Sequence, residues 1–210
     1  MYEDQLCLWF LKPAHLKALL VLDLTDGPRV IPIPMDCLRI CTDLWTPDLG
    51  TCIYRGRGGI VTDRIISQEV IPLCPGLTSL DLYNSGVEDE SIKKIGYAGL
   101  KLTSVNLGST RVTDHGILAI AVNCPLLTSL NVSHTCFISD YSINVVARHC
   151  PALTSLDVHC TRGEITDKSI KAVVASCRAL TFLDVSHTMG AITNEGLNGI
   201  SASCEVKKDW

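Results

Sequence analysis

The strongest constraint on the fold is a six-residue pattern, Leu-x-x-Leu-x-Leu, that recurs five times with little variation. The copies start at positions 77, 102, 127, 153 and 180, so successive starts are 25, 25, 26 and 27 residues apart. One such unit cannot bury its own apolar face, and it must therefore pack against its neighbours. The sequence predicts a continuous stack of similar units.

Every copy contains the same parts in the same order. The alternation of apolar residues predicts a short strand that buries every second side chain. Eight residues after the first leucine comes a hydroxyl, which we expect to satisfy turn backbone groups from inside: Ser85, Thr110, Thr135, Thr161 and Thr188. An apolar residue and helix N-cap residues follow, as in Ile165-Thr166-Asp167, and predict an amphipathic helix.

These parts predict an α/β leucine-rich-repeat solenoid, or horseshoe, with parallel concave strands, convex helices and about six to seven repeats. We expect residues 47–204 to form the solenoid and residues 1–46 an irregular N-terminal cap or degenerate repeat. Residues 205–210 read as a polar tail. Upstream, residues 47–54 align with residues 151–158, which makes Cys52 equivalent to Leu156, and residues 19–24 resemble one more strand.

The chain has eleven cysteines, and several of them occupy one fixed place in the repeat. Those at positions 74, 124, 150, 177 and 204 stand where a helix ends and the chain returns to the next strand. A small apolar thiol suits such a packed position, so we expect free core thiols rather than disulfides or metal ligands. This favours a reducing intracellular compartment, with the cytoplasm first and the nucleus, cilium and mitochondrion as alternatives.

The units resemble the cysteine-containing leucine-rich repeats of F-box/leucine-rich-repeat proteins. The resemblance rests on Cys150-Pro151, Leu153, Leu156 and Val158, with Ile165-Thr166-Asp167, and on the equivalent residues of the other units over about residues 47–204. In that family the solenoid is the substrate-binding surface of a ubiquitin ligase, and a separate F-box docks a Skp-type adaptor. We recognise no F-box in this sequence. Similar repeats occur in cell-cycle antagonists, axonemal regulatory subunits and mitochondrial assembly factors.

Charge and composition disfavour several classes of partner. The formal net charge is -4 and aromatic residues make up 5% of the chain, which argues against nucleic acid and anionic membranes. The start of the chain lacks the features of a secretory signal, and no run of about 18 apolar residues predicts a membrane span.

The expected concave face supplies the candidate binding residues. Position four after the first leucine carries an acid or amide, pointing to solvent in a row that would suit a basic protein partner: Asp81, Asn106, Asn131, Asp157 and Asp184. The alternative is that Asp and Asn are simply usual at this place in the repeat. Tyr83 and His159 at position six and the aromatic Phe182 are the best candidate hot spots.

Position seven carries His134, Cys160 and His187 on adjacent units, with His159 and Cys136 near them. These are metal-ligand types, but the outer members of such a stack would lie about 10 Å apart. We therefore expect no metal site and no cofactor. A thiol–imidazole pair also lacks a recognisable orienting group and oxyanion site, so we expect no enzyme activity.

The sequence thus indicates a non-enzymatic protein-interaction module similar to the substrate-recognition part of Skp-cullin-F-box ligases. The alternative is a structural or regulatory subunit of a large axonemal or mitochondrial assembly.

Overall fold

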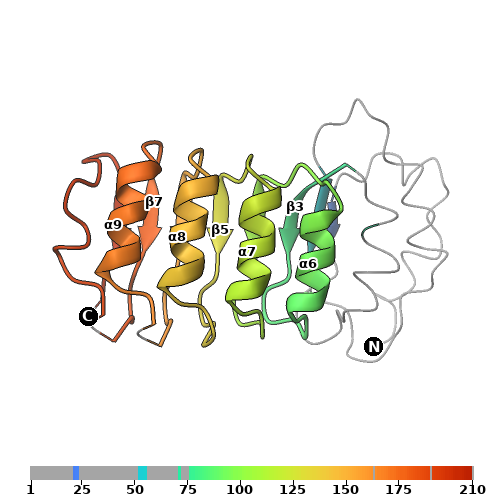
Figure 1. Ribbon diagram of the computed structural model, residues 1–210, viewed down its shortest axis with the longest axis horizontal. Helices are drawn as coiled ribbons and strands as arrows, with labels where there is room; N and C mark the ends of the chain where they lie inside the picture. Colours follow the sequence, from blue (N-terminus) through green and yellow to red (C-terminus); the bar gives the residue numbers. More distant parts are fainter. Residues whose placement is uncertain are drawn as a thin grey trace, which may run out of the picture.

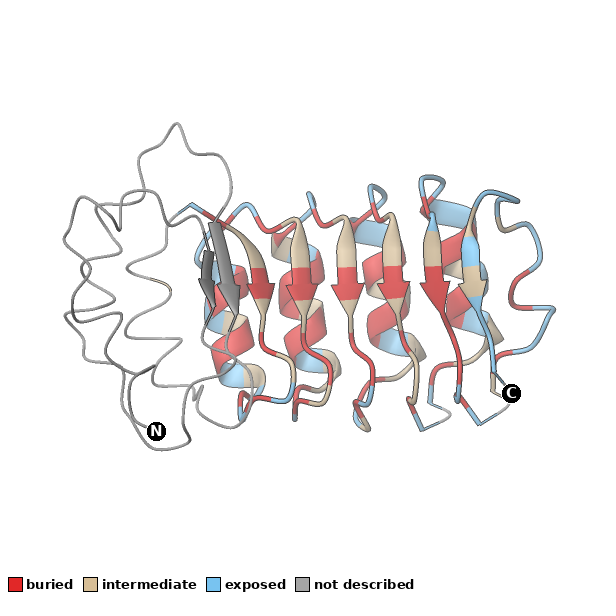
Figure 2. Ribbon diagram, turned by 180° about the vertical axis from the view of Figure 1, so that it is seen from behind, coloured by how far each residue is buried: buried red, intermediate tan, exposed pale blue. Residues whose placement is uncertain are grey.

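The computed structural model describes residues 21–23, 52–55, 71, 76–162, 164–189 and 191–209. They contain one parallel sheet of eight strands, ordered in space as they are in the chain. The helices lie side by side in a single layer on one face of this sheet (Figure 1), and none of the described helices covers the other face (Figure 2).

The strands and helices alternate from β3 to β7. The strands are β1 (Val21–Asp23), β2 (Cys52–Arg55), β3 (Leu77–Asp81), β4 (Ser104–Asn106), β5 (Ser129–Asn131), β6 (Ser155–Asp157), β7 (Phe182–Asp184) and β8 (Glu205–Lys207). The helices are α6 (Asp89–Tyr97), α7 (Asp114–Asn123), α8 (Asp140–His149) and α9 (Asp167–Ser176). The predicted leucine-rich-repeat solenoid is confirmed. Four complete strand–helix units are described, fewer than the six to seven expected, because much of the chain before residue 76 lies outside the described residues.

The core lies between the sheet and the helix layer. The inward apolar residues of each copy, such as Leu77, Leu80 and Leu82, are at most 4% exposed, and Ile92 of the helix that follows β3 is 0% exposed. Burying one such side chain contributes about 1.5–3 kcal/mol. Since equivalent residues of every unit stack in this way, the core is a continuous row that holds the strands in register.

The hydroxyl at position eight has the role predicted for it in four units. Thr110, Thr161 and Thr188 donate to the carbonyl oxygens three residues earlier at 2.6, 2.9 and 3.0 Å, and Thr135 makes the equivalent bond. Ser85 is buried as well, but its hydroxyl has no hydrogen-bond partner among the described residues.

Neighbouring units are also joined by a carboxylate at the first residue of each helix. Asp140 accepts hydrogen bonds from the backbone N–H of Thr166 at 2.8 Å and from its hydroxyl at 2.6 Å. The same pair of bonds joins Asp89 to Thr113, Asp114 to Ser139 and Asp167 to Thr193. Burial would raise the pKa of Asp140, but hydrogen bonds from Ser169 and Thr166 outweigh it and lower that pKa. We call these four pairs the aspartate links.

The repeated cysteines that the structure describes are free thiols at the ends of the helices. Cys124, Cys150 and Cys177 are at most 2% exposed, and burial raises their pKa values to about 11, 12 and 11. The thiol of Cys177 donates to the carbonyl of Cys150 at 3.5 Å, and so contributes to the contact between units. Cys204 is partly exposed, and Cys74 lies outside the described residues.

The ends of the solenoid differ from the sequence predictions in two respects. Tyr54, not Cys52, pairs with Leu80, so the alignment of residues 47–54 was wrong by two residues. A shift of two preserves which side chains face inward, so the hydrophobic pattern could not reveal it. The polar tail expected at 205–210 begins with strand β8, in which Val206 pairs with Leu183 and packs against the core.

The fifth copy also lacks the predicted helix. Residues 194–199 form successive turns instead. Gly196 and Gly199 lie in this segment, and each glycine costs a helix about 1 kcal/mol relative to alanine. Among the described residues, no helix is long and apolar enough to cross a membrane.

Candidate protein-binding face

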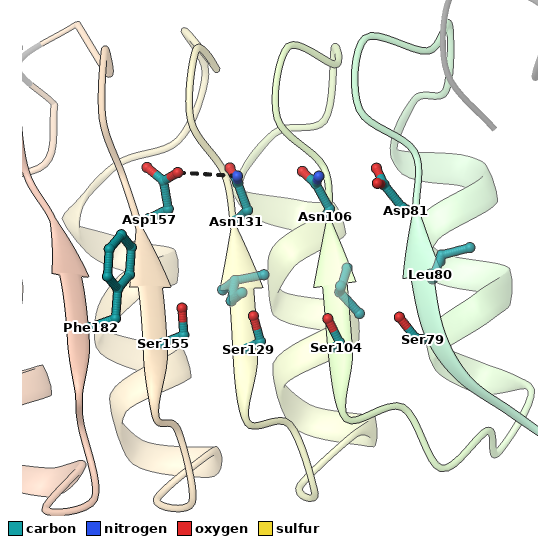
Figure 3. A pocket seen from close by; sticks show the side chains of 12 residues that line it. Ser79, Leu80, Asp81, Ser104, Asn106, Ser129, Asn131, Ser155, Asp157 and Phe182 are labelled. Atoms are coloured by element: carbon teal, nitrogen blue, oxygen red, sulfur yellow. Dashed lines mark hydrogen bonds between the residues drawn. The ribbon is translucent and has the colours of Figure 1, made fainter. Parts of the chain in front are cut away.

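The face of the sheet opposite the helices is formed by positions two and four after the first leucine of each unit. Position two carries Ser79, Ser104, Ser129, Ser155 and Phe182, and position four carries Asp81, Asn106, Asn131, Asp157 and Asp184. The strand register places these side chains in two parallel rows across β3 to β7 (Figure 3). We call this surface the sheet face; it is the expected concave face.

The row at position four has a structural function that the sequence reasoning missed. Each side-chain oxygen accepts a hydrogen bond from the backbone N–H two residues later, as from Tyr83 to Asp81 at 3.0 Å and from Ser133 to Asn131 at 2.8 Å. Asn106, Asp157 and Asp184 make the same bond. These Asx turns end each strand, which explains why Asp and Asn recur here.

The same row is therefore less available to a partner than predicted. Asn131 donates to the second carboxylate oxygen of Asp157 at 3.1 Å (Figure 3). Asp184 is only 9% exposed and accepts from the Ser186 hydroxyl, so the prediction that its side chain points to solvent was wrong. Burial raises the pKa of Asp157, although that residue keeps some exposure.

The charge of the position-four row changes at its β7 end. Register places Lys207 of β8 beside Asp184. The Lys207 ammonium lies 5.1 Å from the centre of the Phe182 ring, within the range of a cation–π interaction. The sheet face therefore carries a basic residue at this end and is not uniformly acidic.

The serine row at position two presents free hydroxyls on the sheet face. Ser104, Ser129 and Ser155 are half-buried, and their hydroxyls make no hydrogen bond to another described residue. The adjacent threonines at position one are occupied, because each donates to the threonine carbonyl of the preceding strand, for example Thr128 to Thr103 at 2.9 Å. The recurring Leu-Thr-Ser of the sequence was the signal for this row.

Phe182 replaces the serine in the fifth unit and so interrupts the row with an apolar ring. The two rows, with the strand backbones between them, enclose a shallow hollow of about 270 Å³ that ends at Phe182. Drug-sized ligands occupy cavities of roughly 300–1,000 Å³ that bury most of their surface. A shallow, polar and extended hollow suits a macromolecular partner better than a small molecule.

Two of the predicted hot spots lie just beyond the strands, at position six. Tyr83 is half-buried and its ring covers Gly108, where an added Cβ would come within 2.8 Å of the ring. His159 is half-buried beside Asp157, with 3.7 Å between its Nδ1 and the carboxylate. Both residues therefore belong to the border of the sheet face, whereas Phe182 lies in the position-two row itself, at its β7 end.

Position seven has the same unusual backbone in every unit. Asn84, Ser109, His134, Cys160 and His187 all have φ values of 55–56°, in the left-handed region. Each donates its backbone N–H to the next unit, as His134 does to the carbonyl of His159 at 2.9 Å. The turn breaks the alternation of the strand and brings position seven beside position six of the next unit.

The comparisons with known proteins agree with this fold. A family model described as Leucine Rich repeat matches residues 100–121. No curated protein sequence matches the chain. Among solved structures, an internalin (inlF) from Listeria monocytogenes str. 4b F2365 is 18% identical, with a TM-score of 0.61 over 94% of this chain and 49% of its own. A TLR13-ssRNA13 complex gives 17% identity and a TM-score of 0.53 over 96% and 32%.

A second internalin of that Listeria strain, internalin C2, is 15% identical over 84% of both chains, at a TM-score of 0.41. The chain thus spans about half the length of the first internalin and about a third of the TLR13 chain. At these identities the likeness shows the fold alone, which is that of a leucine-rich-repeat solenoid.

Proposed function

We propose that this solenoid is a non-enzymatic module that binds a protein partner on its sheet face. The supporting observation is the serine row, in which the hydroxyls of Ser104, Ser129 and Ser155 are ordered on a rigid sheet and have no partner among the described residues. Fixing a surface before binding reduces the entropy lost on association, so such a row favours affinity for a partner of matching shape.

The chemistry of the surface indicates the kind of partner. Hydroxyls and the remaining acceptors of the position-four row suit a segment rich in hydrogen-bond donors, and the Asp157 carboxylate favours Lys or Arg near it. Phe182 supplies an apolar anchor of the type that often dominates binding energy. TLR13 forms a complex with ssRNA13, but the net charge of -4 on this chain argues against a nucleic-acid partner.

A ubiquitin-ligase role is the more specific form of this proposal and follows from the sequence resemblance. In that form the sheet face receives the substrate, and a Skp-type adaptor links the protein to a cullin. Recovery of both adaptor and cullin with the intact protein supports this form, and their absence from an otherwise efficient purification argues against it.

A fixed position in a large assembly is the second candidate, and exposed apolar side chains outside the sheet face favour it. Tyr97, Phe137, Tyr141 and Met189 are 72%, 61%, 60% and 81% exposed. If these residues are interface, the partner contacts the helix side and the turns as well as the sheet.

The test compares two substitutions that introduce the same side chain on opposite sides. Ser129→Arg blocks the sheet face, and Val122→Arg changes a 47% exposed residue of α7. Proteins that co-purify with each variant are quantified by mass spectrometry. We expect the principal partner to be lost with Ser129→Arg and retained with Val122→Arg. The reverse result contradicts binding on the sheet face and favours the assembly subunit.

A further inference from the structure

A compact group of nitrogen and sulfur side chains lies where strands β5 and β6 end. His134, His159 and Cys160 each offer one metal-ligating atom, and these atoms all lie within 4.8 Å of one another. His134 is exposed, and the other two are half-buried. The rings of His134 and His159 are in edge-to-face contact, with their centres 4.3 Å apart.

The turn geometry explains why the sequence argument against a metal missed this group. That argument considered His134, Cys160 and His187, which are stacked on three successive units. The left-handed φ of 56° at His134 and 55° at Cys160 instead places His159, one residue before Cys160, between the two turns. Two adjacent units are therefore sufficient to bring three ligands together.

We propose that His134, His159 and Cys160 form a binding site for a divalent cation of the zinc class. Two imidazoles and one thiolate are ligands that zinc prefers, and three protein ligands leave the fourth tetrahedral position for water.

The distances are close to those of a metal site. Zinc bonds of about 2.0–2.3 Å in a tetrahedron separate neighbouring ligand atoms by about 3.3–3.6 Å. Each of the three side chains therefore needs to move by less than about 1 Å, which small rotations of exposed or half-buried side chains supply.

The surroundings favour a metal over two simpler explanations. The Cys160 thiol makes no hydrogen bond to a described residue, so no described group holds it in the orientation of a Cys–His nucleophile. Nor does backbone preference account for it fully. Histidine is enriched in the left-handed region, but that preference does not extend to a cysteine.

Asp157 adds a feature that accompanies metal-binding histidines. Its carboxylate lies 3.7 Å from Nδ1 of His159 and already accepts that residue's backbone N–H at 3.0 Å. An imidazole held by a carboxylate through one nitrogen presents the other to a metal, in a fixed orientation. The backbone bonds of His134 and Cys160 to the next units, both in the range 2.9–3.0 Å, hold the turns in place.

The proposal is tested by titrating the full chain, stripped of metal and kept reduced, with Zn²⁺ in a calorimeter. The variants are His134→Ala, His159→Ala and Cys160→Ser. The controls are Cys136→Ser, a half-buried cysteine outside the group, and His115→Ala, an exposed histidine of α7. Loss of a residue that hydrogen-bonds to a metal ligand weakens metal binding about 10–100-fold, so loss of a ligand itself should weaken zinc binding by about 100-fold or more.

We expect the wild type and both controls to bind one zinc per chain with the same affinity, and each of the three variants to lose this binding event. Binding that is unchanged in the three variants, or absent from the wild type, overturns the proposal. Co²⁺ gives a second readout that does not depend on affinity alone. The wild type should show a thiolate-to-cobalt charge-transfer band, and Cys160→His should keep the visible bands while losing that one. A charge-transfer band that persists in Cys160→His places the metal at another cysteine and also overturns the proposal.

Discussion

Removing one aspartate link tests how the units are held together. Asp140→Ala removes two hydrogen bonds from Thr166, of 2.8 and 2.6 Å, the interaction with Ser169 and a negative charge at the start of α8. Hydrogen bonds to a charged group contribute about 1.5–3 kcal/mol each when protected from solvent. Because Asp140 is partly exposed, the lower value applies, and we expect a loss of about 2–3 kcal/mol in the free energy of unfolding.

The assay is urea denaturation followed by circular dichroism, with Glu90→Ala as the matched control. Glu90 is also an acid in the first turn of a helix, but its described contact is a 3.4 Å exposed ion pair with Lys93, so its removal should cost less than about 1 kcal/mol. A double-mutant cycle of Asp140→Ala with Thr166→Val should give a coupling energy of about 1 kcal/mol or more. Equal losses for Asp140→Ala and Glu90→Ala, with no coupling to Thr166, would refute the link.

The difference in unfolding free energy between the wild type and Asp140→Ala should depend on pH in a defined direction. The pKa of Asp140 is lower in the folded protein than its ordinary 3.8. Its contribution is therefore fully present above that ordinary value and is lost as the pH falls through the folded pKa. The stability gap between wild type and Asp140→Ala should be constant from pH 7 to about pH 5 and should narrow only below about pH 4.

Three further predictions concern other parts of the stack. Leu156→Ala should lower the free energy of unfolding by about 2–5 kcal/mol, because Leu156 is 0% exposed. Asp157→Ala should lower it by only about 1–2 kcal/mol, through the loss of its bonds to His159 and Asn131. Denaturant unfolding of both variants measures the two losses, and equal losses contradict the assignment of Leu156 to the core and Asp157 to the sheet face. Cys124, Cys150 and Cys177 should resist alkylation at pH 8 until the protein unfolds, since burial raises their pKa values to about 11, 12 and 11. Mass spectrometry after iodoacetamide treatment measures the alkylation of each cysteine, and rapid labelling of these three in the native protein refutes the prediction. Gly96→Ala should destabilise the protein by about 1–3 kcal/mol although alanine favours helices, because the added Cβ would lie 2.7 Å from the carbonyl oxygen of Ala119. A melting temperature equal to or above that of the wild type contradicts this close contact between α6 and α7.

The repeating part of the fold was predictable because each unit carries several independent signals. Leucine spacing set the strands, Thr166 and Ser139 marked the helix starts, and the cysteines marked the helix ends. The less regular ends were not predictable in the same way. Residues 205–207 look polar, but a strand added at the end of a sheet needs only one inward apolar side chain, and Val206 supplies it.

The candidate site was predictable only in part. Strand alternation correctly placed position four on the sheet face for Asp157, but it gave no sign that the carboxylate is engaged by His159 and Asn131. Alternation also assigns His159 and Cys160 to opposite sides, and that rule ends at the turn, where Cys160 takes the left-handed conformation. Local backbone geometry, which residue spacing does not encode, brings Cys160 and His134 close to His159.

The most direct test of the central claim uses a photoreactive amino acid placed singly at Ser129 or at Val122. The first position lies on the sheet face and the second on the exposed side of α7. After irradiation in cell extract, crosslinked proteins are identified by mass spectrometry. Binding on the sheet face predicts a specific crosslinked partner from position 129 and none of that partner from position 122. A partner crosslinked from position 122 alone would contradict the proposed function.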